Sequence, residues 1–232
     1  IAREKGTSIE PLTDGVHTAV CIMVIDLGEQ WSEAFQKTNH KVMITWEVTD
    51  ESTTIDGEEK PRVISKEYTL SLSQKATLRS HLEAWRGKKF TDQELDCFDM
   101  VNILGTSCQL QILHNDKGYA NVAAIMAMPK NMPKVKPRSE TVYFDLSTPE
   151  CLAFLDKLPA WVQDKIKKSE DYKALIKNNP QAEEEFEDES LPFFFFLLKF
   201  YNISSFLVIR KFPENNLKKE LSLTTELTAH LL

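Results

Sequence analysis

Residues 62–85 read RVISKEYTLSLSQKATLRSHLEAW, and the residue pattern changes its period within this stretch. From Arg62 to Leu72 the chain mixes polar residues with β-branched, aromatic and leucine residues, which is typical of a strand. Ser73 is a candidate N-cap. After it, apolar residues follow the spacing of an amphipathic helix that Gly87 stops: Ala76, Leu78, Leu82 and Trp85. The stretch therefore predicts a strand followed directly by a helix.

Four further strands are predicted around this unit. Two precede it, VHTAVCIMVIDLG at 16–28 and the alternating KVMITWEV at 41–48, and a hairpin loop at 50–61 separates the second from Arg62. Two follow it, at 107–114 and 119–128, joined by a turn. Three strands, a helix and two strands is the order of a five-stranded OB-fold Greek-key barrel. We therefore predict a mainly-β OB-fold domain over residues 10–128.

The chain after this domain changes composition several times. Residues 129–140 hold three prolines and four basic residues, which predicts an extended basic linker. Residues 141–180 predict a short helical segment, in which Pro149 opens a helix through Leu158 and Pro159 opens a second helix through Ile176. The aromatic and leucine side chains of this segment are expected to pack on the barrel or on a neighbour. Residues 181–193 form an acidic tip, and residues 194–232 an atypical extension.

The acidity of the chain is concentrated rather than spread. The formal net charge is -7, yet six acidic residues and no basic residue lie within 181–190. Conversely, 117–138 carries five basic residues and no acidic one. A block of like charges repels itself and buries nothing, so the acidic run is expected to be disordered.

The sequence does not favour an enzyme. None of the five histidines has a metal-ligand spacing with a cysteine or carboxylate, and the seven glycines form no phosphate-binding loop. No G-x-S-x-G motif occurs. We expect no metal and no cofactor. The four cysteines form no C-x-x-C pair, which indicates a reducing, cytoplasmic location. Polar residues interrupt the apolar run at 193–209, so no membrane span is expected.

Single-strand binding by such a barrel needs flat aromatic faces for stacking and basic side chains along the backbone path. The predicted contacts are Lys41, Arg62, Lys66, Tyr68, Arg86, Lys88, Lys89, Lys117 and Tyr119, with Trp31 and Phe35 as further candidates in the first loop. Structural roles compete with some of these. Tyr68 could be core, and Arg86, Lys88 and Lys89 could be a solvated helix end. Trp46 and Trp85 are expected in the core.

The acidic run ends in EFEDESLPF, and this ending resembles the acidic Pro-Phe tip of bacterial-type single-stranded DNA-binding proteins. The stretches VISKEYTLSLSQKATLRSHLEAWRGKKFTDQEL and YANVAAIMAMPK also resemble a family of small phage or prophage replication-region proteins. The resemblance implies protection of single-stranded DNA in replication and recombination inside a bacterial host cell. It also implies that the tip recruits replication or repair proteins through Asp188, Glu189, Leu191, Pro192 and Phe193, although here the chain continues beyond Phe193.

A second function remains open from the residues alone. An OB-type barrel also serves as a protein-interaction module, and the fold by itself does not imply DNA binding. In that case the chain acts on a host protein without contacting nucleic acid. In either case a homo-oligomer is possible.

Overall fold

The computed structural model describes residues 11–33, 35–55, 57–147 and 151–178. They belong to the first of two compact units, which spans Ile1–Glu183. The predicted acidic tip at 181–193 and the extension at 194–232 lie outside the described residues.

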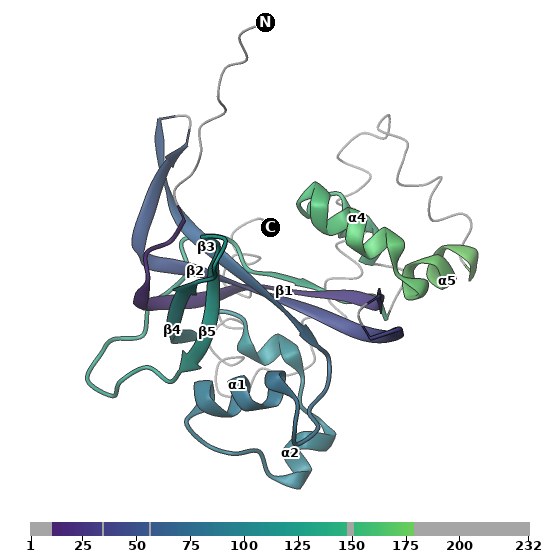
Figure 1. Cartoon of the computed structure of the whole chain (residues 1–232), viewed down its shortest axis with the longest axis horizontal. Coiled ribbons are helices and arrows are strands. Elements are labelled where there is room, and N and C mark those ends of the chain that lie inside the picture. Colours follow the sequence, from purple (N-terminus) through teal and green to yellow (C-terminus); the bar gives the residue numbers. More distant parts are fainter. Residues whose placement is uncertain (1–10, 34, 56, 148–150, 179–232) are drawn as a thin grey trace, which may run out of the picture. The chain divides into compact units, whose positions relative to one another are not determined.

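A single sheet of six strands organises the described residues (Figure 1). Five strands form an antiparallel path in the order β3-β2-β1-β4-β5. Their bounds are β1 Gly15–Ser32, β2 Lys37–Ile55, β3 Glu58–Thr69, β4 Ser107–His114 and β5 Ala120–Met126. The mainly-β prediction is confirmed. The expected count of five strands omitted β6, Val142–Phe144, which pairs with β1 in parallel. A strand of three residues is stabilised mainly by its partner strand, and it is too short to show a recognisable alternation of polar and apolar residues in the sequence.

The long strand β1 bends so that it serves both halves of the sheet. Its first part pairs with β4 and most of its length with β2, and its register shifts between Cys21 and Met23 and between Asp26 and Gly28. Gly28 has a φ of +67°, which L side chains rarely adopt. A Cβ there would lie 2.8 Å from side-chain oxygens of Ser169 and Asp171. The glycine therefore permits both the bend and the close approach of the C-terminal helices.

Helix α1 (Thr77–Arg86) covers one face of the sheet and builds the main core. Its buried side chains are Leu78, Leu82 and Trp85. The ring of Trp85 lies 6.0 Å from that of Trp46 on β2, and its Nε1 donates to the Ser107 carbonyl at 3.0 Å. Trp46 and Trp85 are therefore core residues, as predicted. The helix contacts both β3 and β5, the two ends of the strand path.

The opposite face of β1 and β2 is buried as well. Every residue of β2 from Val42 to Val48 is buried, although alternate residues of a strand point to opposite faces. The segment after β5 lies against these strands: the amides of Arg138 and Ser139 bond to Glu47 of β2, β6 pairs with β1, and helices α4 (Ala160–Lys168) and α5 (Glu170–Asn178) contact β1. Figure 1 shows α1 below the strands and α4 and α5 above them. The helical segment therefore packs on the sheet.

The predicted linker at 129–140 is not a free spacer. Its backbone is fixed to the sheet at two points, and each uses a buried side chain of a strand. The Ser107 hydroxyl donates to the Val135 carbonyl and accepts from the Val135 amide, at 2.7 and 2.9 Å. The Glu47 carboxylate is fully buried and accepts from the amides of Arg138 and Ser139, both at 2.9 Å. Prolines and lysines indicated an extended segment but not these anchors.

Several helix boundaries differ from the prediction. Helix α1 begins after Ala76, because residues 73–76 form a turn in which the Ala76 amide donates to the Ser73 carbonyl. The capping box of α2 (Asp92–Asp96) is present, with Thr91 and Glu94 as its two members. A short 3-10 helix, η1, follows at Met100–Ile103.

The helices after β6 are shorter than predicted. Helix α3 is only Leu152–Leu155. The helix opened by Pro159 does not run through Ile176, because Ser169 has an extended backbone and divides it into α4 and α5. The Ser169 hydroxyl accepts from the Tyr172 amide at 3.1 Å and so caps the second helix.

We expect Glu47→Ala to lower the free energy of unfolding by about 2–4 kcal/mol, because two buried N–H groups lose a charged acceptor. Urea denaturation measures this change. Hydrogen exchange at the amides of Arg138 and Ser139 should accelerate in the variant. Glu59→Ala, at an exposed carboxylate on β3, is the control and should change stability by less than about 0.5 kcal/mol. Unchanged stability and exchange in Glu47→Ala would contradict the anchoring role.

Candidate nucleic-acid interface

Tyr68 lies in the core and does not present its ring to a ligand. Its side chain is 3% exposed and belongs to the cluster around Trp46 and Leu82. The hydroxyl bonds to Nδ1 of His81 at 2.9 Å, and the two rings meet edge to face. Burial raises the pKa of Tyr68, so the phenol keeps its proton in this contact. The predicted stacking role does not fit this position, because a polar partner on α1 makes burial of the tyrosine favourable.

Lys66 points to the same side of β3 as Tyr68, and its side chain reaches strand β5. Its Nζ donates to the Val122 carbonyl of β5 at 2.6 Å and lies 5.9 Å from the Tyr68 ring. Burial lowers the pKa of this ammonium. The contact joins β3 to β5, the two ends of the strand path. A phosphate contact by Lys66 would have to compete with this hydrogen bond.

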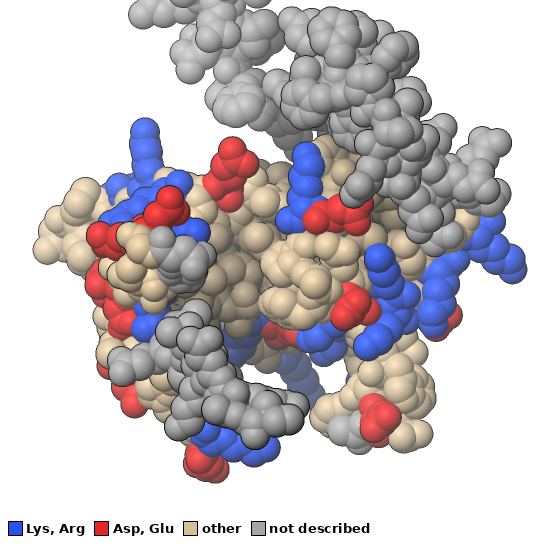
Figure 2. All heavy atoms as spheres, turned by 90° about the horizontal axis from the view of Figure 1, so that it is seen from above, with Lys and Arg blue, Asp and Glu red and all other residues tan. Residues whose placement is uncertain are grey.

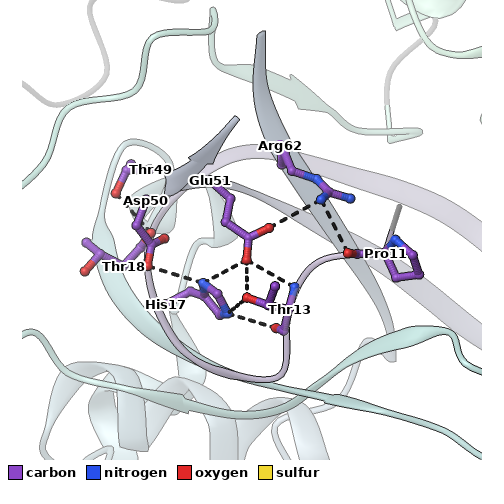
Figure 3. A network of polar contacts seen from close by, with 8 residues as sticks. All are labelled: Pro11, Thr13, His17, Thr18, Thr49, Asp50, Glu51 and Arg62. Atoms are coloured by element: carbon purple, nitrogen blue, oxygen red, sulfur yellow. Dashed lines mark hydrogen bonds and ion pairs between the residues drawn. The ribbon is translucent and has the colours of Figure 1, made fainter. Parts of the chain in front are cut away.

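Arg62 is part of a polar network that fixes the chain before β1 (Figure 3). Its Nη1 lies 3.3 Å from Glu51 and 3.4 Å from the Pro11 carbonyl. Glu51 also accepts from the backbone amide and the hydroxyl of Thr13. His17 Nδ1 lies 3.2 Å from Asp50, and its Nε2 lies 2.9 Å from the Thr13 carbonyl. These bonds engage Arg62 within the fold.

Arg86, Lys88 and Lys89 gather at the end of α1, and the first two share an acidic partner. Arg86 and Lys88 both pair with Glu94, and the guanidinium lies 4.2 Å above the Phe90 ring. Hydrogen bonds from the Thr91 backbone and then from Arg86 lower the pKa of Glu94 to about 2. Lys88 and Lys89 are exposed. The structure therefore leaves these two lysines as the accessible part of the group.

The remaining predicted contacts are accessible but lie on different elements. Lys117 and Tyr119 are exposed at the turn between β4 and β5, where Tyr119 is 66% exposed. Lys41 is half-buried on β2, and its Nζ donates to the Thr69 hydroxyl at 3.1 Å. Trp31 and Phe35 are exposed beside the turn between β1 and β2. The structure does not bring the predicted residues together as one cluster.

Sequence reasoning missed the side of α4 that faces away from the sheet. Val162 and Ile166 are buried, whereas Trp161 is 51% exposed and Lys165 lies 5.8 Å from its ring. The period of the helix could have identified this side, because Trp161 and Lys165 are spaced by four residues, like the buried pair. On α3, Phe154 has a similar neighbour, with Lys157 4.8 Å from its ring. Figure 2 shows Lys and Arg side chains on the side of the molecule where Figure 1 places α4 and α5.

A cavity of about 280 Å³ opens beside α1, between this helix and the segment 94–106. Its lining is mostly apolar and consists of Leu82, Trp85, Arg86, Glu94, Phe98, Asn102, Ile103 and Thr106. Nη1 of Arg86 is buried and has no hydrogen-bond partner among the described residues. The cavity can accept an apolar side chain of a partner.

Metal sites, disulfides and membrane-spanning helices are not found in the described part of the chain. It contains no group of three His, Cys, Asp or Glu side chains placed to hold a metal ion. Cys21, Cys97, Cys108 and Cys151 all lie within this part, and none of them forms a disulfide there. None of the described helices has the length and apolar character needed to cross a membrane. The predicted partner-binding residues Asp188, Glu189, Leu191, Pro192 and Phe193 lie outside the described residues.

Comparisons of the chain with models of protein families, with curated proteins and with solved structures find no match. The assignment of a function therefore depends on the residues and on their geometry.

We expect the pair of Tyr68 and His81 to make the fold sensitive to acid. Burial, and then the charge of Lys66, lower the pKa of His81. As the pH falls, His81 therefore binds a proton at a higher pH in the unfolded chain than in the folded one. The free energy of unfolding decreases as the pH drops below the usual histidine pKa of about 6.5. Urea midpoints at neutral and mildly acidic pH should differ more for the wild type than for His81→Gln. Equal losses in the two proteins would show that His81 does not carry the effect.

Proposed function

We propose that this protein binds single-stranded DNA through an OB-type domain in the cytoplasm of a bacterial host cell, and that it acts by binding rather than by catalysis. The strand order supports the fold assignment. A helix between β3 and β4, a path β3-β2-β1-β4-β5 and a contact between β3 and β5 at Lys66 are the features that an OB barrel combines. The sixth strand and the helices after it are additions to that plan.

The observation that carries the proposal is the set of exposed aromatic side chains that lie next to lysines. Tyr119 is two residues from Lys117 on the turn between β4 and β5. Trp161 lies beside Lys165, and Phe154 beside Lys157. Unpaired bases stack on such rings, and ammonium groups beside them attract the phosphate backbone. Double-stranded DNA hides its base faces, so this chemistry favours single strands.

Recruitment of replication or repair proteins through the acidic tip, from Asp188 to Phe193, is the second part of the proposal. The support is the sequence EFEDESLPF, in which acidic residues precede an apolar Leu-Pro-Phe. Acidic residues speed the encounter with a basic partner, and the apolar residues supply area to bury. A homo-oligomer remains compatible with this function.

We expect residues 1–232 to bind poly-dT much more tightly than duplex DNA of equal length, because stacking requires unpaired bases. Fluorescence anisotropy of labelled DNA at several salt concentrations measures this. The logarithm of affinity should fall with the logarithm of salt concentration, with a slope of about -0.7 for each phosphate neutralised.

Tyr68→Leu is the control in the same assay. It removes an aromatic ring that the fold buries, so the affinity of the folded protein should not change. Equal binding to duplex and single strand, or no binding to poly-dT at low salt, would overturn the proposed function.

The cavity beside α1 favours protein interaction as a second candidate function. An apolar pocket suits a peptide side chain better than a phosphate backbone. The DNA titration separates the two functions, because a protein that acts only on another protein leaves poly-dT free at every salt concentration.

A further inference from the structure

The outward faces of β2 and β3 differ in exposure although the two strands are paired. On β2, Met43, Thr45 and Glu47 are buried, and Glu47 accepts hydrogen bonds from the amides of Arg138 and Ser139. Their partners in the register are Glu67, Ser65 and Val63, which are all exposed. The outward side chains of β3 therefore form an accessible strip beside the covered strand, and we call Val63, Ser65 and Glu67 the β3 strip.

Helix α4 borders one end of the β3 strip. Lys165 forms an ion pair with Glu67, and the same ammonium lies 5.8 Å from the Trp161 ring. The pair neutralises the one acidic side chain of the strip. Trp161 is 51% exposed, so α4 adds an accessible aromatic ring next to a strand that has none on its outward face.

The basic arm, residues 134–138, borders the other end. The amides of Arg138 and Ser139 bind Glu47, and Glu47 is the register partner of Val63. These contacts use backbone atoms, so the exposed side chains of Lys134, Lys136 and Arg138 remain accessible. The arm therefore brings positive charge to this edge of the sheet, and Glu47 does not neutralise that charge because it bonds to backbone amides only.

The distance between the two borders suits a short length of single strand. Val63 and Glu67 are four residues apart, which is about 13 Å along a strand at roughly 3.3 Å per residue. At about 3.4 Å per stacked nucleotide, this length corresponds to roughly four nucleotides. That is the lower limit of about four nucleotides for the site of one OB-type domain.

We propose that single-stranded DNA runs along the β3 strip between its two borders, with a base stacked on Trp161 and with phosphates bound by Arg138 and its neighbours in the basic arm. The inference rests on the proposed DNA binding and extends it: the segment after the barrel forms part of the binding surface. The chemistry of the surface favours single-stranded DNA as the ligand. Its exposed basic side chains suit a polyanion, its one carboxylate is neutralised, and its accessible ring suits a flat base.

The test measures the affinity of full-length variants for labelled dT oligonucleotides by anisotropy. Trp161→Ala should weaken binding by about tenfold or more, the usual effect of losing one stacking ring, and Trp161→Phe should restore most of it. Arg138→Ala should lower the salt slope by about 0.7. The anchor at Glu47 uses the backbone amide of Arg138, so this variant should retain the wild-type urea midpoint.

A charge pair and a matched control sharpen the result. Lys165→Gln leaves Glu67 unpaired and should weaken binding, and the further change Glu67→Gln should restore part of the loss. Lys130→Ala removes an exposed charge before the Val135 anchor and should have less effect than Arg138→Ala. Wild-type affinity in Trp161→Ala and Arg138→Ala, with a wild type that binds dT, would overturn this inference alone. A wild type that does not bind dT overturns the proposed function itself.

Discussion

The burial of β2 on both faces is the constraint on which the rest of this structure depends. One face packs against α1 through Trp46 and Ile44, and on the other face Glu47 bonds to the segment after β5. A strand in that position needs two layers of cover, so the chain beyond β5 is part of the fold and not an appendage. Glu47 directs this second layer, because a buried carboxylate is stable only where hydrogen bonds satisfy it, and the amides of Arg138 and Ser139 do so.

The same constraint determines which charges remain for a ligand. Arg62 stabilises the chain before β1, Lys66 connects β3 to β5, and Arg86 pairs with Glu94. Each of these cations is partly buried and holds two parts of the chain together. A partly buried charge is stable only where a polar partner satisfies it. Other accessible lysines and aromatic rings, such as Lys117, Tyr119 and Trp161, occur at a turn or on the added helices. A charged ligand would therefore contact the segments after β5 at least as much as the five-stranded path.

Much of the strand and helix order could be predicted from the sequence, whereas the surface could not. Alternation in 41–48 and the helical spacing of Leu78, Leu82 and Trp85 identified elements that the structure contains. The position of Tyr68 was ambiguous, because a tyrosine on a strand suits either a core or a stacking surface until its hydroxyl partner is known. That partner, His81, comes from the helix thirteen residues later and cannot be read from the strand. Trp161 was assigned to packing in general, since aromatic content alone does not show which side of a helix faces the sheet.

The sequence by itself determined the local elements: strands where β-branched residues alternate, a helix after Ser73, a turn at Gly118, and the concentration of acid in 181–190. Local periodicity carries this information, because each element depends on neighbours along the chain. The tertiary structure alone decided that residues 129–140 lie on the sheet, that β6 pairs with β1, and which cations are engaged. Those outcomes depend on contacts such as that of Glu47 with Arg138, between residues 91 apart in the sequence. A pattern within one segment does not record which distant group will satisfy a buried charge.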